Sequence, residues 1–176
     1  MIIEQDAQQA KNSFMLSVNA ELHDLRLGEA TIWSIGPFDE EMAKGELSSE
    51  LRFRPAALKE LANSIFMSIE FLFRIVVGTE ELVRIACRFD AEYKLRNDFH
   101  PTKEQVEAFH HGNAIFNCWP FFREFVQNTT SRLNYPSAPV PFLRLMPKRP
   151  GEGSLTVPTE RTIAATKKRT EKKLRA

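Results

Sequence analysis

Two adjacent histidines, His110 and His111, are the first candidates for chemistry in this chain of 176 residues. Neighbouring side chains on a helix point about 100° apart, so the two imidazoles cannot share a metal ion as an i, i+4 pair can. No carboxylate stands at a spacing that would complete the set of ligands. We therefore expect a solvated helix end here, and neither a metal ion nor a cofactor in the protein.

The chain has two cysteines, Cys87 and Cys118, in no paired motif. A nucleophilic cysteine needs a basic partner that lowers the pKa of its thiol. Cys118 instead lies in an aromatic cluster, and Cys87 alternates with apolar residues, so we expect two buried thiols. The seven glycines form neither GxGxxG nor GxxxxGK[ST], the loops that hold phosphates. An enzyme is therefore not expected.

Charge is unevenly distributed along the chain, whose formal net charge is +1. Residues 148–176 hold 9 Lys and Arg against 3 Asp and Glu, which leaves a body of net charge −5. A basic tail can bind phosphates, but no aromatic residue is interleaved with it for base stacking. We expect residues 148–176 to form a flexible linker and tail that is simply solvated or that binds nucleic acid, a membrane surface or an acidic partner.

Alternating apolar and polar residues predict four antiparallel strands. The alternation is clearest over residues 65–77, and Gly78-Thr79-Glu80 connects this strand to a return strand over 82–95 as a hairpin. A long strand is expected over 14–33, with a bulge near His23-Asp24 where the alternation changes phase. A short strand is expected over 51–54, ended by Pro55, and residues 1–13 are expected to be a flexible N-terminus.

Helical patterns follow the strands. Thr102 and Gln105 fit a capping box, which predicts a helix over 103–111 that Gly112 stops. A longer amphipathic helix is expected to run to about Leu133, with Pro120 in its first turn, where a missing N–H costs little. A turn at residues 134–136 and a Pro-spaced extended segment come next. The order of elements predicts one α+β domain over residues 14–147, with a four-stranded antiparallel sheet that a helix covers on one face.

The second face of the strand over 65–77 is unusually apolar, with Phe66, Leu72 and Val76 beside polar residues. Such a face is at least partly covered. A subunit interface and a peptide-binding groove both explain it. Large apolar residues stand in or beside irregular segments near such a groove: Trp33, Phe38, Leu51, Phe53 and Phe142.

These segments together resemble SecB, the protein-export chaperone family, and more closely its relatives linked to toxin–antitoxin modules. The resemblance covers roughly residues 16–146 and is most specific in HGNAIFNCWPFFREFVQNTTSRLNYPSAPVPFLRL (111–145). The run Pro120–Glu124, Arg132 and the Pro-spaced apolar end of this stretch match the family pattern. The strands LHDLRLGEATIW, SELRFRPAAL, SIFMSIEFLFRIVVG and LVRIACRFDAEY match in spacing and residue type.

The resemblance implies a cytoplasmic, ATP-independent holdase that binds unfolded polypeptides in hydrophobic surface grooves. It also implies a homotetramer, a dimer of dimers, in which strands pair between subunits and the long helices pack between dimers. On this chain the implied client-binding residues are Trp33, Phe38, Leu51, Phe53, Phe142 and Leu145. The implied oligomer interface contains Phe66, Leu72, Val76, Phe121 and Phe125.

Two departures from the family pattern bear on the partner. The family member that delivers clients to the SecA motor presents an acidic sheet face, whereas the return strand here offers Arg84 and Arg88. A Pro/Gly linker and a basic segment also replace the usual C-terminal helix and motor-docking tail. Both departures put SecA docking in doubt and favour a dedicated client such as an antitoxin over a general preprotein. The alternative from a different functional class is a nucleic-acid-associated regulator that uses the basic tail.

Overall fold

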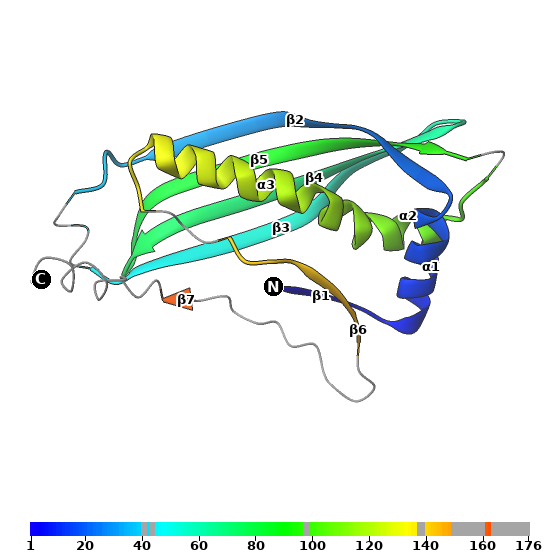
Figure 1. Cartoon of the computed structure of the whole chain (residues 1–176), viewed down its shortest axis with the longest axis horizontal. Coiled ribbons are helices and arrows are strands. Elements are labelled where there is room, and N and C mark those ends of the chain that lie inside the picture. The colour runs from blue at the N-terminus through cyan, green and yellow to red at the C-terminus, as the bar shows by residue number, and fades with distance from the viewer. Residues whose placement is uncertain (40–41, 43–44, 97–98, 137–139, 149–160, 163–176) are drawn as a thin grey trace, which may run out of the picture.

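The computed structural model describes residues 1–39, 42, 45–96, 99–136, 140–148 and 161–162. Four long strands form an antiparallel sheet in the order β2-β5-β4-β3, and the two-residue β7 pairs with the outer edge of β3 (Figure 1). The elements are β1 Ile2–Gln5, α1 Ala7–Ser17, β2 Ala20–Ser34, β3 Leu47–Glu60, β4 Ser64–Val77, β5 Glu80–Leu95, α2 Lys103–His110, α3 Asn113–Arg132, β6 Arg144–Pro147 and β7 Arg161–Thr162. This arrangement confirms the predicted α+β class.

One face of the sheet is covered by α3, which lies across the two inner strands β4 and β5 (Figure 1). The alternate residues of β4 and β5 that point to α3 are buried, as the period of two predicts. Phe71 of β4 stacks on Phe122 of α3, with ring centroids 4.4 Å apart and ring planes at 12°. We call this side the helix face. The other side, to which Leu72 and Arg74 point, is the open face.

The N-terminal part of the prediction is wrong. Residues 1–13 were expected to lack regular structure and Phe14 to begin a strand, but β1 and α1 occupy this region and β2 begins at Ala20. A capping box starts α1: the Asp6 side chain accepts a hydrogen bond from the Gln9 N–H at 2.7 Å, and the Gln9 side chain accepts one from the Asp6 N–H at 3.0 Å. The prediction took the alternation of apolar and polar residues in β2 to begin as early as Phe14, and it therefore missed this helix.

Pro55 does not end β3, which was expected to cover only residues 51–54. The strand extends from Leu47 to Glu60, and its register against β4 shifts between Pro55 and Leu58. Proline is tolerated on an outer strand at a bulge because its missing N–H need not break the inner ladder. The bulge predicted near His23 in β2 is confirmed, because the register against β5 shifts between Leu22 and Asp24.

The predicted capping box of α2 is confirmed, since the side chains of Thr102 and Gln105 each accept a hydrogen bond from the other's N–H. Gly112 separates α2 from α3 as predicted. Pro120, however, lies inside α3 and not in its first turn. The Pro120 side chain is exposed, so the Phe116 carbonyl that lacks an intrahelical partner can bond to water.

One further expectation concerns the C-terminal end of the chain. The basic tail predicted over residues 148–176 lies outside the described residues except for Lys148 and β7. Among the helices that the structure describes, none is long and apolar enough to cross a bilayer.

The interior position of Pro120 leads to a prediction about stability. Pro120→Ala restores an N–H donor to the Phe116 carbonyl, so we expect the free energy of unfolding to rise by about 1–3 kcal/mol, as measured by urea denaturation. Gln127→Ala, at an exposed position of the same helix, should change it by less than about 0.5 kcal/mol. A lower stability of Pro120→Ala would show that the proline supports the helix by another contact.

Candidate functional site

The paired histidines belong to different environments. His110 is buried, and its Nε2 lies 3.0 Å from the carbonyl oxygen of Ser68. Burial lowers the pKa of His110, and the bond to the Ser68 carbonyl offsets only part of this effect. His111 is exposed, with its Nδ1 2.9 Å from the Glu107 carbonyl oxygen. His110 is thus a core residue, which corrects the expectation of a solvated pair.

Neither cysteine has the surroundings of a nucleophile. Cys87 and Cys118 are buried and free. Burial raises the pKa of both thiols to about 12, so they are protonated at neutral pH. Within the described residues, no group of three or more His, Cys, Asp or Glu side chains could hold a metal ion.

An aromatic surface lies where α3, β3 and the extended segment 140–143 meet. We call it the helix-side aromatic surface and define it by Leu51, Phe53, Trp119 and Phe142. Phe53 packs edge-on against Trp119, with ring centroids 5.8 Å apart. The Trp119 Nε1–H donates a hydrogen bond of 3.0 Å to the Pro141 carbonyl. The indole thus joins the outer strand β3 to the Pro-spaced segment.

Arg123 fixes the exposed part of this surface. Its Nε–H donates to the Val140 carbonyl at 3.1 Å, and its guanidinium carbon lies 4.4 Å from the centre of the Phe142 ring. The contact is a cation–π interaction, which orients the ring without burying it. Phe142 remains 74% exposed, more than any other large apolar side chain that the structure describes.

Sequence reasoning left Trp119 and Arg123 out of the candidate site, although a signal was present. The two residues are four apart on α3, so they project from the same side of the helix. The segment that follows α3 is rich in proline, and its carbonyl groups need donors from elsewhere. A tryptophan and an arginine at i, i+4 supply these donors.

The predicted client-binding residues do not all lie on this surface. Leu51 and Phe53 pair with Phe73 and Phe71 of β4, and they therefore point to the helix face of the sheet. Both side chains are half-buried there. Phe53 contacts Trp119, which donates its hydrogen bond to Pro141, the neighbour of Phe142 in the chain.

The other predicted client-binding residues lie further away. Phe38 packs on Tyr135, with ring centroids 5.4 Å apart, and Leu145 is half-buried in β6. Trp33 pairs with Arg84 and therefore lies on the open face, where its side chain is 47% exposed. A second bulge, between Leu27 and Glu29, reverses the alternation of β2. That bulge separates Trp33 from the rest of the set.

The predicted interface residues are also divided between the two faces. Phe66, Leu72 and Val76 are half-buried on the open face. Phe125 of α3 packs edge-on against Phe89 of β5, and Phe121, one turn earlier on the same flank, is 45% exposed. The prediction missed three exposed apolar residues that β2 adds on the helix face near this flank: Leu22, Leu27 and Ile32.

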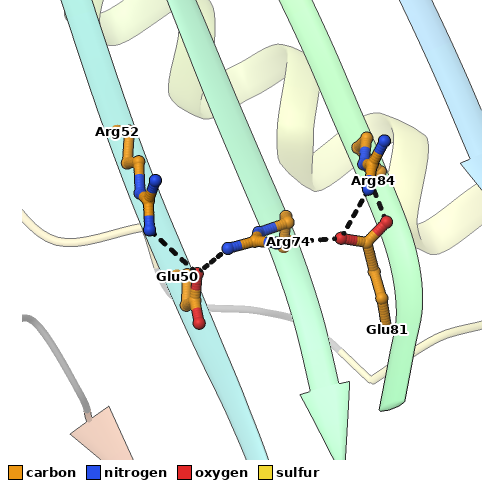
Figure 2. A network of polar contacts seen from close by, with 5 residues as sticks. All are labelled: Glu50, Arg52, Arg74, Glu81 and Arg84. Carbon is orange, nitrogen blue, oxygen red and sulfur yellow. Dashed lines mark hydrogen bonds and ion pairs between the residues drawn. The ribbon is translucent and has the colours of Figure 1, made fainter. Parts of the chain in front are cut away.

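The open face carries a network of ion pairs that crosses three strands (Figure 2). Arg74 of β4 bridges Glu50 of β3 and Glu81 of β5, and Arg84 binds Glu81 at 2.7 Å. Burial pushes the pKa of Glu81 upward, but the hydrogen bonds from Arg84 and Arg74 outweigh it and hold this pKa below its usual value. The same carboxylates raise the pKa of Arg74.

Beside the network, the open face is hollowed by a cavity of about 520 Å³ that all four long strands line. Leu72 is among its apolar lining residues, and its charged lining includes the pairs Arg54–Glu70 at 2.6 Å and Arg88–Glu29 at 3.2 Å. Arg88, one of the two basic residues noted in the sequence, is therefore matched by carboxylates. The open face is balanced in charge and not acidic.

The arrangement is similar to that of a solved structure from Mycobacterium tuberculosis, the SecB-like chaperone Rv1957 in complex with a ChAD peptide from the Rv1956 HigA1 antitoxin. The TM-score is 0.68 at 21% sequence identity, over 77% of this chain and 99% of that chain. This chain has the SecB-like fold.

Other comparisons add little to the SecB-like assignment. A protein of unknown function from Streptococcus agalactiae reaches a TM-score of 0.32 at 16% identity, over 70% of this chain and 97% of that chain. No protein-family model and no curated protein matches the chain. The assignment therefore rests on three-dimensional structure, in agreement with the resemblance seen in the sequence.

The role of Arg123 can be tested by hydrogen exchange. Arg123→Met keeps the length of the side chain but removes the donor to Val140 and the cation over Phe142. Because a hydrogen bond contributes about 1 kcal/mol, we expect amides of residues 140–146 to exchange about fivefold faster. Arg132→Met, in the last turn of the same helix, is the matched control and should leave this segment unchanged. Equal exchange rates in the two variants would contradict the role assigned to Arg123.

Proposed function

We propose that this protein is an ATP-independent chaperone that holds unfolded polypeptide on the helix-side aromatic surface. The observation that carries the proposal is Phe142, which Arg123 and the neighbouring hydrogen bond from Trp119 to Pro141 hold in an exposed position, while Trp119 itself packs against half-buried Phe53. A rigid scaffold that presents aromatic side chains to water fits an apolar ligand.

The expected affinity follows from apolar burial. One large apolar side chain contributes about 2–3 kcal/mol when it is buried, so four anchors of a client contribute on the order of 10 kcal/mol. Ordering the client costs several kcal/mol, which leaves an affinity near the micromolar range for one segment. A long client that contacts several equivalent surfaces of an oligomer gains further avidity. This mechanism requires no nucleotide, metal ion or catalytic group.

Within this proposal, a dedicated cytoplasmic client, such as an antitoxin, is favoured over preproteins for export. The protein of similar fold from M. tuberculosis was solved with an antitoxin peptide. The open face of this chain pairs its arginines with carboxylates, and so it lacks the acidic character that docking to a SecA-type motor would use.

We also propose that the chain assembles as a homotetramer, a dimer of dimers. The supporting observation is the exposed apolar strip of Leu22, Leu27, Ile32 and Phe121 along β2 and α3. Beyond it, no described strand pairs with the outer edge of β2. A second copy that added its own β2 there would satisfy the backbone of the edge, and helices packed between dimers would cover Phe121.

The client surface is tested by two matched variants, Phe142→Ser and Trp33→Ser, which remove exposed aromatic rings from opposite sides of the sheet. We expect Phe142→Ser to raise the Kd for an unfolded client at least about tenfold, because a ring worth about 2 kcal/mol is lost. Trp33→Ser should bind normally. The assay is suppression of light scattering by a refolding client without ATP. The reverse ranking of the variants would move the site to the open face.

The assembly is tested by Phe121→Glu and Phe116→Glu. These phenylalanines are 45% and 46% exposed, but the helical repeat places them on different sides of α3. We expect Phe121→Glu to lower the molar mass measured by multi-angle light scattering to that of a smaller species, because a charge would be buried between subunits. Phe116→Glu should keep the mass of the unmodified protein. A monomeric unmodified protein would contradict the tetramer directly.

A further inference from the structure

The outer edge of β3 is available for pairing with another strand. On its inner side β3 pairs with β4 along its length, whereas on its outer side the described residues contribute only β7. That pairing involves Ser48 with Thr162 and Ser49 with Arg161. From Glu50 onward, no described strand covers the outer backbone groups of β3. An uncovered strand edge is a template for adding a further strand.

The two halves of this edge differ in their fitness for pairing. In the second half, Pro55 lacks an N–H and a bulge follows it, and both features oppose the addition of a strand. The first half, residues 47–54, has neither feature. Its helix-face side chains are those of Leu51 and Phe53, which belong to the proposed client surface. A strand added here would place alternate side chains beside them.

The chain itself shows how this edge is occupied, because β7 pairs antiparallel with the start of the unprotected half. Pro158 would interrupt a strand on one side of β7, but on the other side apolar Ile163 is separated from Arg161 by an even number of residues. This is the spacing of residues on one face of a strand. The segment therefore has the composition of a weak client that is covalently attached to its own binding site.

We infer that the first half of the outer edge of β3 is a strand-docking site, and that β7 occupies its start as a built-in competitor of the client. The inference rests on the proposed function and adds the mode of binding and its regulation. The client is an extended segment with apolar residues at every second position. It pairs with the backbone of residues 47–54 and must displace β7 to do so.

The strength of this competition can be bounded. A tethered segment acts at an effective concentration on the order of millimolar, which far exceeds a micromolar client. Pairing through only two residues is weak, so the site is only partly blocked. The apparent Kd of the client equals its intrinsic Kd divided by the fraction of chains whose edge is free. If this fraction is about a tenth to a third, the apparent Kd rises by about three- to tenfold.

The experiment compares four full-length or shortened chains: the unmodified protein, a chain without residues 149–176, Thr162→Pro and Thr170→Pro. Thr162→Pro disrupts strand pairing in β7, whereas Thr170→Pro has the same charge and length but lies outside β7. The probe is labelled reduced carboxymethylated α-lactalbumin, a permanently unfolded chain, and its Kd is measured by fluorescence anisotropy. Hydrogen exchange of residues 47–50 is followed in parallel.

We expect the truncation and Thr162→Pro to lower the Kd about three- to tenfold and to accelerate exchange at residues 47–50. Thr170→Pro should match the unmodified protein, and a peptide of residues 154–166 should compete with the probe for the truncated chain. Equal Kd values for Thr162→Pro and the unmodified protein would overturn the competition while leaving the chaperone function intact. Failure of all four chains to bind the probe would instead reject the proposed function.

Discussion

The constraint on which this structure depends is that one long helix, α3, covers the middle of a sheet of four long strands. An α-helix with its side chains is about 10 Å wide, whereas the outer axes of four strands are about 15 Å apart. Helix α3 can therefore bury the helix face of β4 and β5 but not that of β2 and β3. The fully buried residues of the inner strands and the half-covered ones of the outer strands show this division. The aromatic surface beside β3 and the apolar strip beside β2 both result from this incomplete coverage of the helix face.

The two uncovered flanks of α3 are treated differently. On the flank toward β3, the segment 140–143 is fastened to the helix by Trp119 and Arg123, which leaves a narrow aromatic surface around Phe142. On the flank toward β2 the described residues provide no such segment, and the apolar strip ends at an open strand edge. A narrow anchored surface suits an extended chain. A long flat strip with an open edge suits a second copy of the same fold.

The sequence predicts the interior of this fold better than its margins. The strict alternation of β4 and β5 results from burial of one face, and it was read correctly. The wrong predictions fall at positions where the surrounding structure tolerates a residue, such as proline, that the local pattern disfavours. Pro55 was taken as the end of a strand and Pro120 as a residue of the first helical turn, but Pro55 lies at a bulge of an outer strand and Pro120 lies on the exposed side inside α3. In β2, one of two bulges was foreseen, and the second moved Trp33 to the opposite face. A phase change that involves glycine, here Gly28, leaves little trace in an apolar pattern.

The open face explains why only one side of the sheet is proposed to bind clients. Arg74 and Glu81 at the centre of this network are only 24% and 18% exposed, so much of the attraction between them offsets the cost of removing their charges from water. The effect of the network is to keep charged groups over Leu72 and Val76, and a client that covered them would have to desolvate several paired charges. That cost falls on any apolar chain that approaches from this side, whereas on the helix-side aromatic surface the charge of Arg123 already stacks on the Phe142 ring. For the proposed function, the distribution of charge therefore favours the face where α3 leaves aromatic side chains within reach.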